Sequence, residues 1–319
     1  MSKNLHDMAL AYHKEGMPGK IDVSSHKKLN NDQDLSLAYS PGVAAPVREI
    51  VKDPSNVNQY TIKGNLVAVI TDGSAVLGLG NVGPLAAKPV MEGKAVLFKY
   101  FADINAFNIE LDTQDVDEIV KTVKNIAPTF GGINLEDISA PRCFEIEERL
   151  IEELDIPVFH DDQHGTAIIV AAGLLNALEI QGKSVTSAKI VVAGGGSAGI
   201  ATLDLLVSLG FKKENMLLVD RRGVVSKEQI SIVNKYKAAF AVDTDKKTLS
   251  DAIDGADVFI GVARGNLVTQ EMIKSMAKKP IIFALSNPDP EISVEQVFAC
   301  REDALMATGR SDFPNQVNN

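Results

Sequence analysis

The stretch KIVVAGGGSAGIATLDLLVSLG, residues 189–210, decides the fold class of the chain. Its apolar run at residues 190–193 predicts a buried strand, and the glycines of GGGSAG follow directly. After Gly199 the sequence continues as a helix pattern to about residue 209. A strand that passes through a glycine-rich turn into a helix is typical of a doubly wound parallel sheet.

The same alternation continues on both sides of this turn. A long apolar helix is predicted from Thr166 to Ile180, before the turn. After the turn, strands are predicted at residues 215–220, 256–262 and 280–286, and helices at residues 227–241, 248–255 and 269–277. Regular alternation of apolar strands with helices predicts an α/β fold whose C-terminal part is a Rossmann-like parallel sheet.

The first half of the chain mixes helices, polar turns and strands. Strands are expected at residues 66–70 and 95–101, and helices at residues 4–15, 113–127 and 141–154. The pattern changes after IPVFHDDQHG, which predicts an N-terminal α/β domain at residues 1–160 and a Rossmann-like domain at residues 161–319. The final stretch, ATGRSDFPNQVNN, has no closing helix pattern, so we expect the second domain to be incomplete there.

The composition excludes several classes of partner. The formal net charge is -10 and the pI is about 5.1, which argues against nucleic acid or an acidic membrane as partner. The N-terminal residues lack a continuous apolar run, and no stretch approaches the roughly 18 apolar residues of a membrane span. Cys143 and Cys300 have no metal-type spacing and are expected to be reduced thiols. We therefore expect a soluble, cytoplasmic protein.

Two glycine loops fit the spacing of a dinucleotide-binding turn, GLGNVG at residues 78–83 and GGGSAG at residues 194–199. Seven residues separate the first loop from its preceding strand, and Pro84 follows it directly, which is too loose for a strand-to-helix elbow. The second loop has no such gap, and Asp220 lies at the end of the next strand, where an acid can bind ribose hydroxyls. GGGSAG is therefore the predicted cofactor loop, with these residues: Gly194, Gly195, Gly196, Ser197, Ala198 and Gly199. GLGNVG is predicted to be a turn in which backbones pack closely.

The residues after the second strand leave the choice of cofactor open. Asp220 by itself favours NAD, because a carboxylate repels a 2′-phosphate. Arg221 and Arg222 follow it and could bind that phosphate, or they could be a solvated turn. The sequence therefore predicts NAD or NADP without distinguishing them.

Two pairs of adjacent acids suggest a metal site. Glu136 and Asp137 follow one apolar stretch, and Asp161 and Asp162 follow another. Each pair could be exposed charge at a helix start. Together they would form an all-oxygen site suited to Mg²⁺ or Mn²⁺. A zinc site formed by His160 and His164 is disfavoured, because the chain has only five histidines and no paired cysteines.

Two further residues are candidates for proton transfer. Lys94, in PVMEGKAVLF, is expected at the entrance to a buried strand, where it could act as a general base or be an ordinary strand-edge lysine. Tyr39, in LAYSPGVAAP, could be a phenolic acid or a packing residue.

Seven motifs together resemble the malic enzymes, in particular the short bacterial type. In chain order they are YSPGVA, TDGSAVLGLGNVG, PVMEGK, LEDI, HDDQHGT, GGGSAG and LSNP. The resemblance implies oxidative decarboxylation of (S)-malate to pyruvate and CO₂ with NAD or NADP and a divalent cation. It also implies an active site in a cleft between the two domains and a homodimer, with the N-terminal helix as a possible contact.

The resemblance also implies roles for individual residues. Tyr39 matches the acid that protonates C3 of the enolate, and Lys94 matches the base that takes the C2 hydroxyl proton. Asp161 matches the acid that orients or assists the lysine. The remaining matches are Glu136, Asp137 and Asp162 to the metal ligands, and Asn287 and Asn318 to asparagines that line the malate and nicotinamide pocket.

One departure from the family pattern concerns the substrate. Larger malic enzymes carry an arginine for a malate carboxylate where this chain has Ala75, so the partner of that carboxylate is open. Two other functions stay possible at this stage. One is malolactic decarboxylation of malate to lactate with tightly held NAD, and the other is an incomplete chain that binds nucleotide without turnover.

Overall fold

The computed structural model describes residues 3–76 and 79–319 and divides the chain into two compact α/β units. The first unit comprises residues 1–73, 82–136 and 146–158. The second comprises residues 74–81, 137–145 and 159–319. Each unit is therefore assembled from three stretches of chain.

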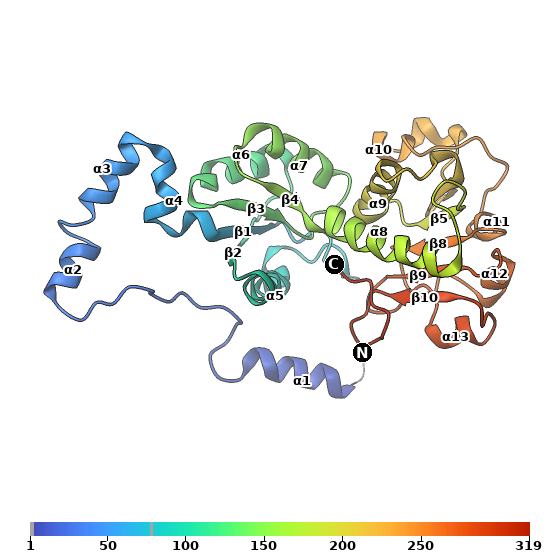
Figure 1. Cartoon of the computed structure of the whole chain (residues 1–319), viewed down its shortest axis with the longest axis horizontal. Coiled ribbons are helices and arrows are strands. Elements are labelled where there is room, and N and C mark those ends of the chain that lie inside the picture. The colour runs from blue at the N-terminus through green and yellow to red at the C-terminus, as the bar shows by residue number, and fades with distance from the viewer. Residues whose placement is uncertain (1–2, 77–78) are drawn as a thin grey trace. The chain divides into compact units, whose positions relative to one another are not determined.

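The first unit is built on a four-stranded sheet in the order β2-β1-β3-β4. Its strands are β1 (Leu66–Thr71), β2 (Asn105–Glu110), β3 (Gly132–Leu135) and β4 (Val158–His160). Strand β1 pairs in parallel with β2 and with β3. Helix α5 (Pro84–Ala102) lies on one face of this sheet, and α6 (Val116–Ile126) and α7 (Arg142–Glu153) lie on the other (Figure 1). Ala68, Val69 and Ile70 are fully buried, as expected for a parallel strand covered on both faces.

The strand expected at residues 95–101 is wrong, because these residues form the second half of α5. The buried positions Ala87, Met91 and Ala95 recur every four residues and form one helix face. Tyr100 and Phe101, which made the segment look like a buried strand, are 80% and 77% exposed. The strand that follows β1 along the chain is β2, which the sequence pattern did not predict.

The first glycine loop ends in a close backbone contact between Gly83 and Gly73. Gly78 lies outside the described residues. Gly83, at φ 80°, caps the start of α5, and its N–H donates to the Gly73 carbonyl oxygen at 3.1 Å. A Cβ atom on Gly73 would overlap the Gly83 carbonyl group. This geometry supports the interpretation of GLGNVG as a turn that brings two backbone segments together.

The N-terminal part of the first unit consists of short helices: α1 (Lys3–Lys14), α2 (Asp32–Ala38), α3 (Ala44–Lys52) and α4 (Val57–Tyr60). Helices α2 and α3 bury none of their residues. Most of the large apolar side chains that the structure leaves exposed belong to this part of the chain or to α5 and β2.

The second unit is built on a six-stranded sheet in the order β10-β9-β8-β5-β6-β7. Its strands are β5 (Ile190–Ala193), β6 (Met216–Asp220), β7 (Gly223–Val224), β8 (Val258–Gly261), β9 (Ile281–Ala284) and β10 (Leu305–Thr308). Only the pair β6–β7 is antiparallel among these described pairings. This parallel sheet confirms the predicted α/β class.

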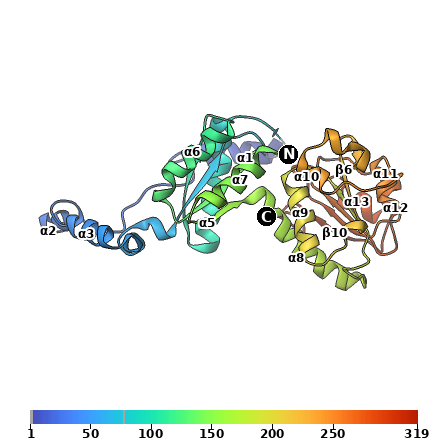
Figure 2. The ribbon, with the colours of Figure 1, turned by 90° about the horizontal axis from the view of Figure 1, so that it is seen from above.

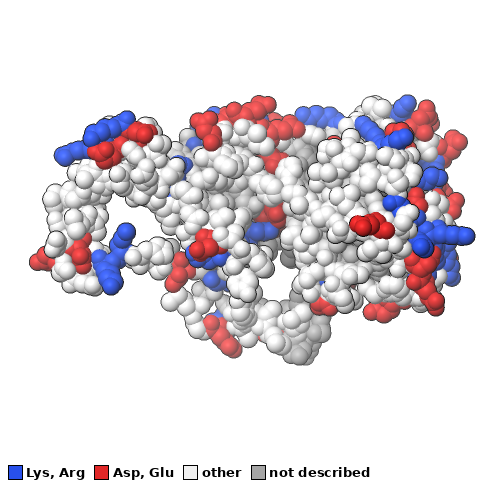
Figure 3. Space-filling model, in the orientation of Figure 1, with Lys and Arg blue, Asp and Glu red and all other residues white. Residues whose placement is uncertain are grey.

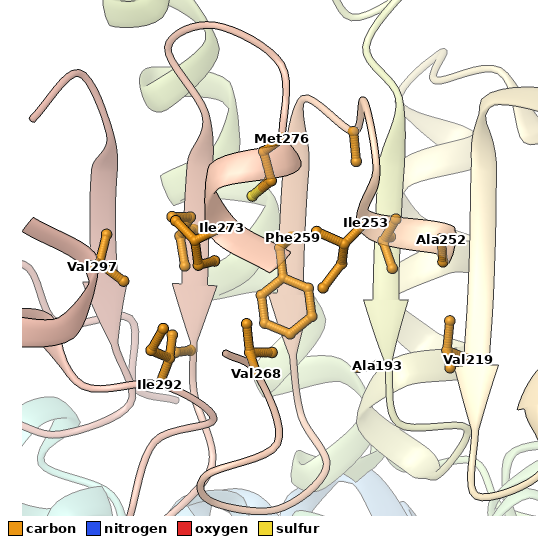
Figure 4. Close-up of a cluster of buried hydrophobic side chains, with 14 of the residues drawn as sticks. Ala193, Val219, Ala252, Ile253, Phe259, Val268, Ile273, Met276, Ile292 and Val297 are labelled. Atoms are coloured by element: carbon orange, nitrogen blue, oxygen red, sulfur yellow. The ribbon is translucent and has the colours of Figure 1, made fainter. Parts of the chain in front are cut away.

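Helices cover both faces of this sheet. On one side lie α8 (Asp161–Gln181) and α9 (Ser197–Ser208). On the other side lie α11 (Leu249–Ile253), α12 (Gln270–Ser275) and α13 (Val294–Phe298), as Figure 2 shows. The core under α11–α13 centres on Phe259 of β8, which meets Ile253, Ile273 and Met276 (Figure 4).

The long helix expected at residues 227–241 is also wrong. The chain forms a 3₁₀ helix at Lys227–Ile232 and then a separate short helix, α10 (Lys235–Ala238). The Asn234 side chain accepts the N–H of Lys237 at 3.0 Å and so starts a new helix. An N-cap residue in the middle of the segment is the physical reason for the break.

The hydropathy of the helices and the distribution of acidic side chains describe the surface of the protein. None of the helices in the described part of the chain is both long and apolar enough to cross a bilayer. Acidic side chains gather over α6 and α7 on the face that Figure 3 shows.

We expect Arg301→Ala to destabilise the second unit. The Arg301 guanidinium donates to the carbonyl oxygens of Ile273 (3.1 Å), Met276 (3.1 Å) and Ala277 (2.8 Å), and to both oxygens of Asp303. Its loss leaves carbonyl groups in the last turn of α12 and just after this helix without these donors, and should lower the free energy of unfolding by about 2–3 kcal/mol.

Thermal or urea unfolding measures this effect. Arg310→Ala is the matched control, because Arg310 is 39% exposed and its contact with Asp312 should contribute at most about 1 kcal/mol. Equal losses of stability in the two variants would contradict the capping role of Arg301.

Candidate active site

Three carboxylates meet where β3 ends and α8 begins. Glu136 and Asp137 follow β3 directly, and Asp162 lies in the first turn of α8. One carboxylate oxygen from each lies within 4.8 Å of the others. Glu136 and Asp137 are buried, and the Asp162 side chain is 31% exposed. The structure therefore brings together the three residues predicted as metal ligands.

The backbone around Asp137 holds its carboxylate in place. Asp137 has φ 54°, a left-handed conformation that costs a non-glycine residue about 1 kcal/mol or more. Its N–H donates to Asp162 Oδ2 at 2.7 Å, and its carbonyl oxygen accepts the N–H of Ala75 at 2.9 Å. Strain of this kind persists where surrounding contacts fix the backbone, often at functional sites.

The donor set fits a hard divalent cation. Three anionic oxygens so close together repel one another, and a bound cation would remove that repulsion. Oxygen ligands are those that Mg²⁺ and Mn²⁺ prefer. His160 is buried with Nε2 3.8 Å from Asp162 Oδ2, and His164 packs against the Phe159 ring. Neither histidine belongs to the three-residue group found among the described residues, which favours an all-oxygen site over a zinc site.

Lys94 reaches the same carboxylates from α5. Its Nζ lies 3.1 Å from Glu136 Oε1, and the side chain is 16% exposed. The other oxygen of Glu136 accepts from Asn134 Nδ2 at 2.9 Å. The expected position of Lys94 at the start of a strand is wrong, because it lies in the middle of a helix. The helix nevertheless presents the amine to the end of β3.

Asp161 begins α8 beside the last residue of the chain. Its Oδ2 accepts from Asn319 Nδ2 at 2.9 Å, and Asn319 also contacts Thr166 Oγ1 at 3.3 Å. A Cβ atom on Gly165 would overlap the Asp161 carboxylate. Asn318, predicted to line the malate and nicotinamide pocket, is the neighbour of this asparagine, and its predicted role stays a prediction.

Two other predicted residues lie in exposed positions. Asn287 follows β9, and its Nδ2 donates to the Gly309 carbonyl oxygen at 3.4 Å. Tyr39 ends α2 and is 74% exposed. No hydrogen bond or ring contact described for the chain joins the Tyr39 side chain to Lys94 or to the three carboxylates. The structure therefore does not bring Tyr39 to these groups.

The second glycine loop has the geometry of a dinucleotide cradle. Gly194 follows β5 at φ 123°, and its N–H donates to the Val219 carbonyl oxygen at 2.8 Å. Gly196 is the N-cap of α9, which starts at Ser197 and Ala198. A Cβ atom on Gly199 would overlap the Gly194 carbonyl oxygen, so only glycine lets the helix approach the loop. No heavy atom lies within 4 Å of a Cβ built on Gly196, which leaves space above the helix N-terminus for a pyrophosphate.

A pocket of about 930 Å³ opens beside this loop within the second unit. Its lining includes Gly194, Gly195 and Gly196, together with Asp220 and Arg221 after β6. Its volume lies in the range of cofactor sites. The loop glycines and Asp220, which are distant in sequence from one another, thus line one cavity.

Glu291, which the sequence pattern did not single out, links two loops of the second unit. It is fully buried, and its oxygens accept from the N–H of Ala263 at 3.0 Å and of Ser286 at 3.1 Å. Burial raises the pKa of Glu291, although these N–H groups oppose the shift. The carboxyl group joins the loop after β8 to the loop after β9. Glu291 lies in the proline-rich stretch NPDPEI, which also contains Asp289, so the sequence gives only a weak signal for such a role.

We expect Gly199→Ala and Gly196→Ala to have different effects. The Gly199 methyl group would overlap backbone, which should lower the free energy of unfolding by about 1–3 kcal/mol. The Gly196 methyl group meets open space and should leave stability unchanged while it blocks a bound pyrophosphate.

Thermal unfolding of the ligand-free protein and titration with nicotinamide dinucleotide measure the two effects separately. If Gly196→Ala bound the dinucleotide as tightly as the native chain, the assignment of the cradle would be incorrect.

Two family models match the chain, one over the part that contains Lys94 and one over the part that contains the second glycine loop. Residues 18–151 match the family model of the malic enzyme N-terminal domain, and residues 163–319 match that of the malic enzyme NAD-binding domain. An NAD-dependent malic enzyme from Thermotoga maritima is 46% identical with a TM-score of 0.90, over 100% of this chain and 83% of that one.

Curated relatives extend the comparison. The chain is 58% identical to an NADP-dependent malic enzyme of Halomonas elongata, over 98% of this chain and 74% of the relative. It is 54% identical to a bifunctional malic/malolactic enzyme of Bacillus subtilis, over 99% of this chain and 77% of the relative. It is 56% identical to an NADP-dependent malic enzyme of Rhizobium meliloti, over 98% of this chain, and spans only 41% of that relative's length. The chain belongs to the malic enzyme family.

Proposed function

We propose that this chain catalyses the oxidative decarboxylation of (S)-malate to pyruvate and CO₂, with reduction of NAD or NADP and with Mg²⁺ or Mn²⁺ bound. The observation that carries the proposal is the position of Lys94, whose amine lies 3.1 Å from Glu136 in the cluster of three carboxylates. A proton acceptor beside oxygen ligands for a divalent cation is the arrangement that oxidation of a bound 2-hydroxy acid needs.

In this reaction, Lys94 and Tyr39 transfer protons and Asp161 orients the lysine. When bound, the nicotinamide supplies a hydride acceptor and the divalent cation supplies a Lewis acid at the C2 oxygen. Lys94 takes the C2 hydroxyl proton as C2 loses hydride, and Asp161, held by Asn319, orients the lysine. Loss of CO₂ leaves the enolate of pyruvate, and Tyr39 gives a proton to its C3. Malate and oxidised cofactor become pyruvate, CO₂ and reduced cofactor, which balances atoms and charge.

We expect Lys94→Ala to lower kcat by a factor of about 10²–10⁴, the range for loss of a general base. Absorbance of the reduced nicotinamide, recorded with malate, Mn²⁺ and either NAD or NADP, measures this rate. Lys88→Ala is the control, because Lys88 lies on the same helix, is 48% exposed and pairs with Glu92 and Glu110. Full activity of Lys94→Ala would remove the base assignment, and an inactive native protein with both cofactors would overturn the proposed function.

A second activity is supported by the bifunctional malic/malolactic relative. In malolactic decarboxylation the hydride returns to the product, so malate yields lactate and CO₂ without net reduction of the cofactor. Analysis of the products separates the two activities. Lactate formed without reduced nicotinamide would favour the malolactic reaction over the oxidative one.

We further propose that the protein acts as a homodimer through its N-terminal helices. Val43, Val47 and Val51 follow a four-residue spacing at and within α3 and are 41%, 52% and 78% exposed. A row of exposed valines at helical spacing is an apolar stripe that a second copy would cover. The exposed Tyr39 lies on the same segment. For Tyr39 to protonate the enolate, this segment must come close to the carboxylate cluster of one of the two copies.

We expect Val47→Asp to weaken the dimer, because a charge would then be buried in the interface. Light scattering coupled to size exclusion measures the molecular mass as the protein is diluted. Lys52→Ala is the matched control at the end of the same helix, where Lys52 is 68% exposed. A monomer at all concentrations in the native protein would show that the stripe has another purpose.

A further inference from the structure

The asparagine two positions before Glu136 holds one oxygen of that carboxylate. Side chains alternate along a strand, and the Glu136 N–H continues the ladder with β1 by donating to the Ile70 carbonyl oxygen at 2.9 Å. Asn134 and Glu136 therefore lie on the same face of the sheet. Asn134 is buried, and a buried amide costs free energy unless it is hydrogen-bonded. Its Nδ2 donates to Glu136 Oε2 at 2.9 Å, so this amide is used on a predicted metal ligand.

The two oxygens of the Glu136 carboxylate contact donors of different charge. Lys94 Nζ lies 3.1 Å from Oε1, and the neutral Asn134 amide contacts Oε2. The terminal torsion of a glutamate is soft, so one contact alone would leave the plane of the carboxylate free to turn. Contacts on both oxygens fix that plane. Because the amide carries no charge, it holds the carboxylate without neutralising the negative charge that attracts a cation.

An equivalent asparagine lies on the other side of β1. The strand register pairs Val69 of β1 with Asn108 of β2 and with Asn134 of β3. Asn108 is also buried, and its Nδ2 donates to the carboxylate of Glu110, two residues later. The sequences NIE at residues 108–110 and NLE at residues 134–136 therefore form the same side-chain contact on the two strands that flank β1.

The two glutamates differ in their surroundings. Each pairs with a lysine of α5, Glu110 with Lys88 at 3.5 Å and Glu136 with Lys94 at 3.1 Å. Glu136 belongs to the group of three carboxylates found in the described part of the chain, and Glu110 does not. The contact on β2 therefore repeats the contact on β3 at a place without a metal cluster. This comparison separates a role in the sheet from a role in metal binding.

We propose that Asn134 is a positioning residue of the metal site, which holds the Glu136 carboxylate in the orientation that binds the divalent cation. Residues that orient a metal ligand through a hydrogen bond typically change metal affinity by a factor of about 10–100 when they are replaced. The proposal rests on the proposed function, which includes the cation. It adds a residue that none of the seven family motifs contains.

Replacement of Asn134 by leucine tests this role, because leucine is similar in size and lacks the donor. The full chain is titrated with Mn²⁺ in the absence of malate and nucleotide, and electron paramagnetic resonance of free Mn²⁺ measures the affinity. We expect Asn134→Leu to bind Mn²⁺ at least about tenfold more weakly than the native chain. An unchanged affinity would overturn the proposal.

Asn108→Leu is the matched control, because it removes the same kind of contact from the strand on the other side of β1. We expect it to leave the affinity for Mn²⁺ within about twofold of the native value, since Glu110 is not a predicted metal ligand. Thermal unfolding of the metal-free variants measures the structural cost of each replacement, which should be similar. Equal losses of Mn²⁺ affinity in the two variants would assign the effect to the sheet as a whole and would overturn the positioning role.

A second variant keeps the test decisive if Asn134→Leu does not fold. Asn134→Ala removes the donor without adding bulk, and the same loss of Mn²⁺ affinity is expected.

The two proposals fail in distinguishable ways. Native Mn²⁺ affinity in the Asn134 variants, together with malate oxidation by the native chain, would remove the positioning role and leave the proposed function standing. Weakened Mn²⁺ binding in these variants, together with a native chain that does not oxidise malate, would do the reverse. A native chain that binds no Mn²⁺ would overturn the positioning role and the metal dependence together.

Discussion

The mutual repulsion of three carboxylates is the constraint on which the site depends. Glu136, Asp137 and Asp162 place oxygens within 4.8 Å of one another, and two of the three side chains are buried. The protein holds them there with Lys94 on one side and with the backbone N–H of Asp137 on the other. A divalent cation bound to these oxygens would relieve the repulsion and would thereby stabilise the folded chain.

Close backbone contacts at glycines occur in both units, before α5 and after β5. Gly73 meets Gly83 before α5, and Gly199 meets Gly194 after β5, each at a distance that no side chain would allow. The first contact fixes the start of the helix that carries Lys94, and the second closes the turn beside the pocket that Asp220 also lines. The two similar glycine motifs therefore use the same property of glycine, the absence of a side chain, to bring backbone segments together at two different places.

The sequence predicted the four inner strands of the second sheet, β5, β6, β8 and β9, but not its edge strands β7 and β10, and it predicted parts of the first unit poorly. Apolar strands such as residues 190–193 and 281–284 are buried on both faces, and their composition alone marks them as strands. Residues 95–101 have a similar composition but lie in a helix, because their neighbours Ala87 and Met91 continue one buried helix face. A short apolar run has no period of its own, so only its packing decides between the two.

The sequence by itself determined the α/β class, because this depends on local order and spacing. From the same kind of local pattern it also predicted GGGSAG as the cofactor loop and Glu136, Asp137 and Asp162 as metal ligands. Only the tertiary structure decided that Lys94 meets Glu136, that Asn319 meets Asp161 and that Lys237 neutralises Asp220. These pairs are separated by 17 to 158 positions along the chain. Such contacts arise from the packing of whole elements, and local sequence patterns carry no information about which distant side chains a fold brings together.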